Sequence, residues 1–283
     1  MLAEVIRDLT HAEYELFRKL VYAQSGINLG SEKKQLVRAR LGRLLRRGQF
    51  RSYRAYYDHV KNDASGQELC ELLDAISTNT THLFREKTHF DFLQTALRRW
   101  TQTGADRAAR STIRIWSAAC SSGEEPHSIA MTAHDALRAS PSVQVKLLAT
   151  DISTKMLERA RVARYEPHRV GTVPPPFQER YFRRVRQDAT EWLELVPELQ
   201  RLITFSRFNL MSEQFPFQHS FDVIFCRNVM IYFDRPTQQT LVNKFARHLR
   251  PGGFLLIGHS ESLNAIQHPL KYVRPTIYEK ARA

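Results

Sequence analysis

An acidic turn follows the first strongly apolar run in the second part of the chain. The segment 118–128 reads AACSSGEEPHS and comes directly after the apolar run 113–116. A strand that ends in small residues and glycine, then opens a helix, usually binds a phosphate through free backbone N–H groups. Glu124 and Glu125 occupy this turn and would repel a phosphate. The turn therefore predicts a ligand that combines an anionic group for the helix N-terminus with a positive charge.

Polar residues also follow the other predicted strands. Asp151 comes after the second strand, Asn209 after the third, and Arg227 with Asn228 after the fourth. In an open α/β sheet these strand ends share one edge, where the ligand binds. An aspartate there can accept hydrogen bonds from two ribose hydroxyls, and no lysine is present to hold a pyrophosphate. A nucleoside with an amino-acid tail fits this set, and S-adenosylmethionine is the common one.

Each of these acids, taken alone, also has a structural explanation. Asp151 could cap the helix that follows it, and Glu124 with Glu125 could simply favour a helix start. The ordered set of polar residues across four strand ends favours the ligand, and both interpretations stay open for any single residue.

Two patterns of apolar residues divide the chain. The first 80 residues predict only helices, over about 11–23, 31–47, 53–61 and 67–76. From residue 113 onward, short apolar runs alternate with helical segments, which predicts a doubly wound, Rossmann-like α/β sheet. The predicted strands are 113–116, 145–149, 202–205, 221–225 and 254–257, with a closing antiparallel pair at 272–273 and 276–280; the helices are about 126–138, 154–161 and 236–249.

One connection is too long for an ordinary crossover between strands. Between residues 165 and 201 the chain carries three prolines at 174–176, then two β-like runs at 180–185 and 192–196. This predicts a small antiparallel β insertion at about 174–200. The predicted organisation is an all-α N-terminal domain (1–80) followed by an α/β domain (81–283) that contains the insertion.

Composition narrows the class of protein. The net charge is +13, and Cys70, Cys120 and Cys226 are isolated, which fits reduced cytoplasmic thiols. No apolar run approaches the ~18 residues of a membrane span, and the start of the chain lacks the order of a signal peptide, so we expect a cytoplasmic protein without membrane insertion. The histidines lack the spacing of metal ligands, so no metal site is expected.

Five longer segments resemble one known family. The runs ISTNTTHLFRE, IWSAACSSGEEPHSIAM, LLATDIS, FDVIFCRNVMIYFD and LRPGGFLLIGHSESL are similar to the signatures of the bacterial chemotaxis receptor methyltransferases, the CheR family. The resemblance covers nearly the whole chain, in the family's order. It implies transfer of the methyl group of S-adenosylmethionine to glutamate side chains on the cytoplasmic helices of chemoreceptors.

The resemblance also implies the cofactor contacts. They are Asn79, Thr81, Arg85, Glu125, Asp151, Asn209, Leu210, Arg227 and Asn228. Three positions depart from the family's usual residues: His82 replaces an apolar or aromatic residue, His127 a tyrosine, and Ala119 a glycine. None of the three is an expected cofactor contact, so they affect local packing more than the assignment.

The implied chemistry needs alignment more than acid–base catalysis. A glutamate is already ionised at pH 7, with an ordinary pKa near ~4.3, and its carboxylate can attack the sulfonium methyl directly. We expect Arg85 and Tyr232 to be the catalytic residues that position the acceptor carboxylate. Tyr232 has an equal alternative as a core aromatic beside Phe225 and Phe233.

The helix predicted over 31–47 is strongly basic. If its leucines and valine (Leu36, Val37, Leu41, Leu44 and Leu45) turn inward, most of its cations face outward. We expect this face to dock the glutamate-bearing receptor helix, although a merely solvated face is the ordinary alternative. The expected docking residues are Lys33, Lys34, Arg38, Arg43, Arg46 and Arg47.

The sequence leaves two alternative functions open, and it also bears on one further partner. A nucleic-acid methyltransferase would use the positive charge, but the chain lacks basic residues interleaved with exposed aromatics. A cofactor-binding regulator without activity is the second alternative. We expect a monomer that does not bind nucleic acid. In the resembled family a glycine-bearing loop accompanies binding of the receptor's C-terminal pentapeptide, and the turn at 186–191 has no glycine, so we expect no strong binding of that peptide.

Overall fold

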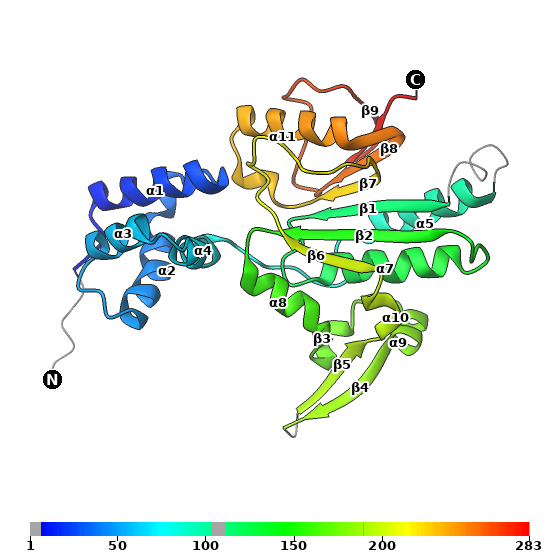
Figure 1. Ribbon diagram of the computed structural model, residues 1–283, viewed down its shortest axis with the longest axis horizontal. Helices are drawn as coiled ribbons and strands as arrows, with labels where there is room; N and C mark the ends of the chain where they lie inside the picture. Colours follow the sequence, from blue (N-terminus) through cyan, green and yellow to red (C-terminus); the bar gives the residue numbers. More distant parts are fainter. Residues whose placement is uncertain (1–6, 103–110, 189, 283) are drawn as a thin grey trace.

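The protein consists of a helical domain beside a larger α/β domain (Figure 1). The computed structural model describes residues 7–102, 111–188 and 190–282. The first six residues, which contributed to the expectation of no signal peptide, lie outside the described residues, as does Ala189 in the glycine-free turn. No helix among the described residues combines the length and the apolar character that crossing a membrane requires.

Four helices build the N-terminal domain, as the sequence predicts. They are α1 (His11–Ser25), α2 (Lys34–Arg47), α3 (Tyr53–Asn62) and α4 (Gln67–Ile76). The Thr10 hydroxyl and the Glu13 carboxylate close a capping box at the start of α1. Phe17, Leu41 and Leu72 are fully buried where the helices meet. The domain therefore has a hydrophobic core of its own.

A seven-stranded sheet forms the centre of the α/β domain. Its order is β6-β2-β1-β7-β8-β10-β9, with parallel pairing from β6 to β8 and antiparallel pairing of β10 with β8 and β9. The strands are β1 (Thr112–Ala118), β2 (Gln144–Asp151), β6 (Ile203–Arg207), β7 (Phe221–Cys226), β8 (Leu249–Ile257), β9 (Leu270–Arg274) and β10 (Ile277–Lys280). The predicted fold class is confirmed, because the strand order and the crossovers are those of a Rossmann-like sheet.

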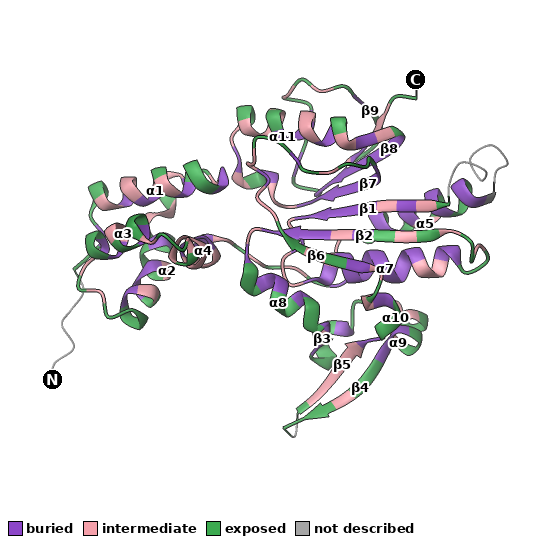
Figure 2. Ribbon diagram, in the orientation of Figure 1, coloured by how far each residue is buried: buried purple, intermediate pink, exposed green. Residues whose placement is uncertain are grey.

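Helices cover the two faces of the sheet unequally. α5 (Thr88–Gln102) and α7 (Glu124–Leu137) pack with α8 (Thr154–Val162) on one face, while α11 (Arg235–His248) covers β7 and β8 on the other. Sequence patterns did not predict α5. The connection 208–220 between β6 and β7 contains no helix, and its aromatic side chains pack on Trp116 instead. Figure 2 shows the exposed residues of β2 and β6 at this edge of the sheet.

The insertion differs in detail from its prediction. It is a three-stranded sheet in which β5 (Thr190–Leu195) pairs with β4 (Phe182–Gln187) and also with β3 (Arg164–Tyr165). Within the proline run, Pro175 begins the short helix α9 (Pro175–Tyr181), where a proline costs no hydrogen bond. A second short helix, α10 (Pro197–Gln200), leads back to the main sheet.

Candidate cofactor-binding site

One cavity lies between the helical domain and the carboxyl ends of the parallel strands. Its walls include residues from α2, from the linker 77–81 and from the turns after β1, β2, β6 and β7. All the sequence-predicted cofactor residues line it, and so does Tyr232: Asn79, Thr81, Arg85, Glu125, Asp151, Asn209, Leu210, Arg227 and Asn228. The structure thus brings the whole predicted set together, and the contact of each with cofactor remains a prediction.

The acidic turn bends sharply between β1 and α7. Ala119 and Ser121 have positive φ angles of 65° and 49°, and Gly123 has a φ of 98°. A Cβ on Gly123 would lie 2.8 Å from the Cβ of Ala160, so only glycine fits this close approach to α8. The bend brings the Ser121 backbone and the start of α7 to the cavity wall.

The two glutamates of this turn have different surroundings. Glu124 is buried, accepts a hydrogen bond from the Ser122 hydroxyl at 2.7 Å and forms an ion pair with Arg169, so its carboxylate is used within the protein. Glu125 lines the cavity, accepts a hydrogen bond from the Ser117 hydroxyl at 2.7 Å and lies 3.0 Å from Nε of Arg227. Burial raises the pKa of Glu125, and the Arg227 guanidinium opposes that rise.

Arg227 forms the buried floor of the cavity. Its Nη2 donates to the Arg85 carbonyl at 2.7 Å, and its Nη1 lies 3.1 Å from Nδ1 of His89. The guanidinium also lies over the rings of Phe90 and Phe225. These contacts fix the guanidinium, which in turn positions Glu125 and the Arg85 backbone, and its contact with the cofactor remains a prediction.

Asp151 is fixed at the end of β2 by two backbone hydrogen bonds. Its Oδ2 accepts from the Ser121 N–H at 2.7 Å and its Oδ1 from the Ser153 N–H at 2.9 Å. Ser153, whose hydroxyl accepts from the Met156 N–H, is the residue that caps α8. Asp151 is therefore not the side-chain cap of the helix, and each of its oxygens keeps a lone pair for a ligand hydroxyl. Burial raises the pKa of Asp151.

Contacts between the two domains close one side of the cavity. The Asn209 amide donates to the Gln24 carbonyl at 2.6 Å, and its side-chain oxygen accepts from the Met211 N–H. The Asn28 N–H donates to the Tyr232 carbonyl at 2.8 Å. The Asn209 side chain thus joins the domains, which the sequence-based interpretation of this residue as a cofactor contact did not anticipate.

The two expected catalytic residues line the same cavity as the acids. Arg85 is partly exposed, and its Nη1 donates to the Thr80 carbonyl at 3.1 Å. Tyr232 ends a 3₁₀ turn after β7, and Nζ of Lys33 lies 5.6 Å from the centre of its ring. Tyr232 also packs beside the core of the α11 face, as its alternative interpretation predicts, and its role in positioning the acceptor remains a prediction.

Helix α2 contributes to the cavity in a way that the sequence pattern did not predict. Leu36 was expected to turn inward with the other apolar residues, but its side chain is 44% exposed and lines the cavity, so that prediction is wrong. On the same helix, the Arg40 guanidinium binds the linker through the Ile76 carbonyl, the Ser77 carbonyl at 3.2 Å and the Thr78 hydroxyl at 3.1 Å. Helical periodicity alone cannot predict these hydrogen bonds, because their acceptors lie outside α2.

The six expected docking cations have three kinds of surroundings. Lys33 faces Tyr232 at the cavity, whereas Arg38 pairs with Asp8 at 2.7 Å and Arg47 pairs with Glu71. The other three have no ion pair within the described part of the chain: Lys34, Arg43 and Arg46. Arg43 and Arg46 are both exposed.

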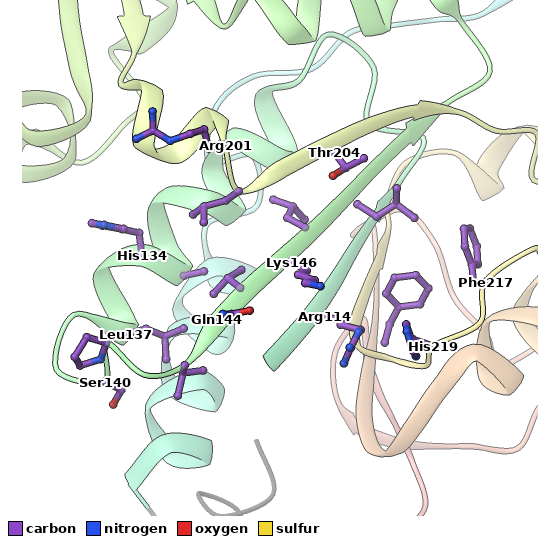
Figure 3. A pocket seen from close by; sticks show the side chains of 18 of the residues that line it. Arg114, His134, Leu137, Ser140, Gln144, Lys146, Arg201, Thr204, Phe217 and His219 are labelled. Carbon is purple, nitrogen blue, oxygen red and sulfur yellow. The ribbon is translucent and has the colours of Figure 1, made fainter. Parts of the chain in front are cut away.

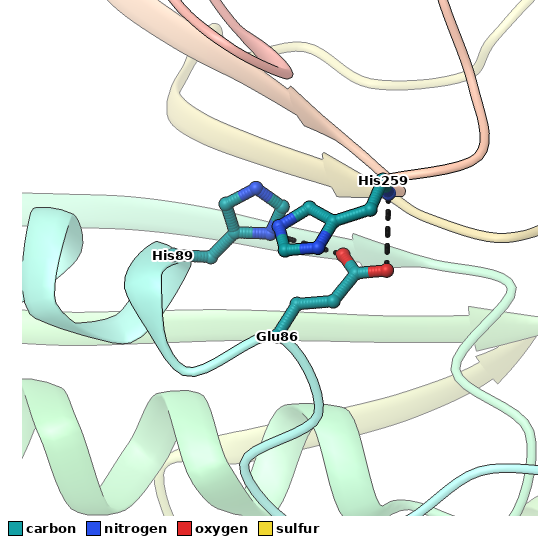
Figure 4. A group of neighbouring side chains, drawn as sticks. All are labelled: Glu86, His89 and His259. Atoms are coloured by element: carbon teal, nitrogen blue, oxygen red, sulfur yellow. Dashed lines mark hydrogen bonds and ion pairs between the residues drawn. The ribbon is translucent and has the colours of Figure 1, made fainter.

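Glu86, His89 and His259 approach one another behind the cavity floor (Figure 4). The Glu86 carboxylate accepts from the His259 N–H at 3.0 Å, and His89 lies between Arg227 and the Thr276 hydroxyl. Burial, followed by the Arg227 charge, lowers the pKa of His89 to about 3. The Arg227 guanidinium lies 3.1 Å from Nδ1 of His89 and would repel a metal ion bound there. We therefore interpret the cluster as a polar network that supports Arg227.

Comparisons with known proteins agree with this arrangement. The family described as "CheR methyltransferase, SAM binding domain" matches residues 79–278, and "CheR methyltransferase, all-alpha domain" matches residues 12–77. A chemotaxis protein methyltransferase from Borreliella burgdorferi is 40% identical over 274 residues, which cover 96% of this chain and 95% of the relative. Chemotaxis protein methyltransferase 2 from Pseudomonas aeruginosa is 38% identical, covering 96% and 94%, and the Escherichia coli chemotaxis protein methyltransferase is 35% identical, covering 95% and 91%. This chain therefore belongs to the CheR family of S-adenosylmethionine-dependent methyltransferases.

Proposed function

We propose that this protein methylates glutamate side chains of chemoreceptor cytoplasmic domains and so produces glutamate methyl esters. The names of its relatives support a role in chemotaxis. The observation that supports the reaction most strongly is the single cavity in which the fixed carboxylate of Asp151, the Glu125–Arg227 pair and the half-exposed Arg85 meet. The reaction would take place in the cytoplasm, where those receptor domains lie.

The cavity has the donor and acceptor groups that S-adenosylmethionine requires. Asp151 keeps lone pairs for the ribose hydroxyls, and Ile152, Phe208 and Leu210 supply apolar surface beside it for the purine. Ser121 and the start of α7 present polar groups for the amino-acid tail. When bound, S-adenosylmethionine supplies the methyl group, whose bond to sulfur breaks as its bond to the acceptor carboxylate oxygen forms, leaving a neutral thioether.

No general base is needed for this transfer. The acceptor glutamate is ionised at pH 7, so the protein's contribution is orientation and exclusion of water. Arg85 can orient the acceptor carboxylate without removing its charge, and Tyr232 bounds the same space. Lys33, beside the Tyr232 ring, adds positive charge at the point where a glutamate-bearing helix would enter.

Radiolabelled methyl transfer tests the proposal directly. The protein is incubated with S-adenosylmethionine labelled in the methyl group and with receptor-rich membranes, tRNA or DNA in separate reactions. We expect label on the receptor band alone, and we expect base to release it as methanol, because methyl esters are base-labile. Label on tRNA or DNA would show a nucleic-acid methyltransferase, and cofactor binding without any transfer would show a regulator.

Replacing Arg85 provides the matched variant for this assay. Arg85→Ala should lower turnover by roughly 10²-fold, because the acceptor carboxylate loses its orienting charge, while the melting curve stays close to that of the wild type. Arg235→Ala, at an exposed arginine of α11, is the control and should leave turnover unchanged. An Arg85→Ala enzyme with wild-type turnover would show that another residue positions the acceptor.

A further inference from the structure

A second hollow lies at the amino ends of β1 and β2, at the opposite edge of the sheet from the cofactor cavity (Figure 3). Its volume is about 1090 Å³, and none of its lining residues belongs to the cofactor cavity. That volume is slightly above the range of about 300–1,000 Å³ found for small-molecule sites. The established methyltransferase assignment gives this hollow no role.

The hollow is lined from both faces of the sheet: His134 and Leu137 of α7 lie on one face, and Phe217 lies on the other, where the sheet lacks a helix at this point. Parallel strands are usually joined by a helical crossover, but the connection 208–220 between β6 and β7 has none. Its side chains Phe208, Phe215 and Phe217 pack on Trp116 and cover the middle of β1. The amino-terminal ends of β1 and β2 stay uncovered on this face.

Two cations stand side by side on this uncovered face. Arg114 of β1 and Lys146 of β2 are direct partners in the parallel register. Their neighbours Ile113, Ile115 and Leu147 belong to the core on the other face, so the two charged side chains share the open face. Like charges directly opposite each other on neighbouring strands are destabilising, and the strands are only about 4.8 Å apart.

No carboxylate balances this pair within the described chain. Neither Arg114 nor Lys146 takes part in an ion pair there, and none of the described residues that line the hollow is acidic. The nearby Asp222 carboxylate already accepts from the Arg114 backbone N–H at 2.8 Å and pairs with Arg250 at 2.7 Å. His219 lies close to Arg114 in Figure 3 and adds a third group that can donate to an anion.

We propose that this hollow binds a phosphorylated small molecule of about nucleotide size. A phosphate carries enough charge to neutralise both cations, and the Arg114 guanidinium can donate two parallel hydrogen bonds to it. The phosphate group binds between Arg114 and Lys146, and the apolar part of the ligand packs against Phe217 and Leu148. Such a ligand would act at a distance from the cofactor cavity, through β2, whose Lys146 lines the hollow and whose Asp151 lines the cavity.

Calorimetry with two probes tests this site. Inorganic pyrophosphate and ADP are titrated, at constant ionic strength, into the wild-type protein and into the Arg114→Gln/Lys146→Gln variant. We expect saturable binding of both probes to the wild type and at least a tenfold weaker affinity in the variant. Arg51→Gln/Lys61→Gln is the control, because it removes the same charge from two exposed residues of the helical domain and should bind like the wild type.

The remaining outcomes each decide the question. The Arg114→Gln/Lys146→Gln variant should melt at or above the wild-type temperature without any phosphate and should bind S-adenosylhomocysteine normally, which shows that it is folded. No heat from either probe with the wild type would overturn the proposal. An equal loss in the control variant would also overturn it, since the attraction would then come from the overall charge. Binding of a poly-glutamate peptide without binding of pyrophosphate would show instead that the hollow docks an acidic protein.

Discussion

The cofactor cavity and the outer face of α2 both depend on charged side chains, but they hold them in opposite ways. In the cavity, Arg227 pairs with Glu125, and both oxygens of Asp151 accept backbone hydrogen bonds. On α2, Arg43 and Arg46 project into solvent without an ion pair among the described residues. Groups of the first kind fix the shape of a site, so replacing them should alter folding and binding together. Groups of the second kind should alter only the encounter with a partner.

Removing Arg227 should have the largest effect of any single change. Arg227→Ala leaves the Glu125 carboxylate buried without its counter-charge, and Glu86 loses the same cation nearby. Breaking a buried pair in this way costs on the order of 3–5 kcal/mol in the free energy of unfolding. Urea denaturation measures the loss, with Arg43→Ala as the control that should change stability by less than ~0.5 kcal/mol. Equal stabilities of the two variants would remove the distinction between the cavity and α2.

Replacing Asp151 tests the same comparison through the affinity for S-adenosylmethionine. Asp151→Ala should weaken binding of S-adenosylmethionine by on the order of 1–3 kcal/mol, because the ribose loses its acceptor and the Ser121 and Ser153 N–H groups lose theirs. Asp151→Asn keeps one oxygen acceptor and should fall between the wild type and Asp151→Ala. Calorimetric titration measures all three affinities. An affinity of Asp151→Ala equal to the wild type would show that the ribose binds elsewhere.

The residues around the cofactor cavity differ in how far the sequence could predict them. The positions of Asp151 and Asn228 were predictable because Asp151 ends β2 and Asn228 lies two residues after β7, and the topology of a parallel sheet gathers such positions at one edge. The Arg227–Glu125 pair was not predictable as a pair, since its members belong to different strand ends and meet only in the folded sheet. The hydrogen bonds from Arg40 to the linker and the exposure of Leu36 were not predicted for a related reason. Helical periodicity assigns each residue a face, but it does not say that the linker and the second domain occupy part of that face.

A buried histidine makes stability depend on pH. His127 is buried in α7, where its Nδ1 contacts the Tyr165 hydroxyl and its Nε2 has no hydrogen-bond partner among the described residues. Burial lowers the pKa of His127 to about 3. The folded pKa is below the unfolded value, so the unfolded chain binds more protons and stability falls as pH decreases through ~6.5. One such histidine costs about 2 kcal/mol between pH 6.5 and pH 5.

Phenylalanine at this position should remove that contribution. His127→Phe should flatten the wild type's pH dependence over this interval without abolishing it, because burial also lowers the pKa of His89 to about 3. Urea denaturation at pH 7, 6 and 5 measures the slope. His168→Phe, at an exposed histidine, is the control and should keep the wild-type slope. An unchanged slope in His127→Phe would mean that the ring is protonated within the fold.

The exposed cations of α2 should show the smallest effect, and one confined to the receptor. Reversing Arg43 and Arg46 to glutamate is cleaner than including Arg38, because a glutamate at 38 would also repel its present partner Asp8. Exposed charge pairs contribute about 0.2–1 kcal/mol each, so the apparent KM for receptor should rise by roughly fivefold while the affinity for S-adenosylmethionine is unchanged.

The salt dependence of the apparent KM for receptor distinguishes a docking surface from a face that is only solvated. Added salt should weaken the wild type's advantage over the Arg43→Glu/Arg46→Glu variant, because a Debye length of about 10 Å at 0.1 M ionic strength shortens as ions are added. Arg51→Glu/Lys61→Glu, at exposed positions elsewhere in the helical domain, is the control with the same change in net charge. If that control raises the KM as much, the receptor responds to overall charge, and the outer face of α2 is solvated without being a docking surface.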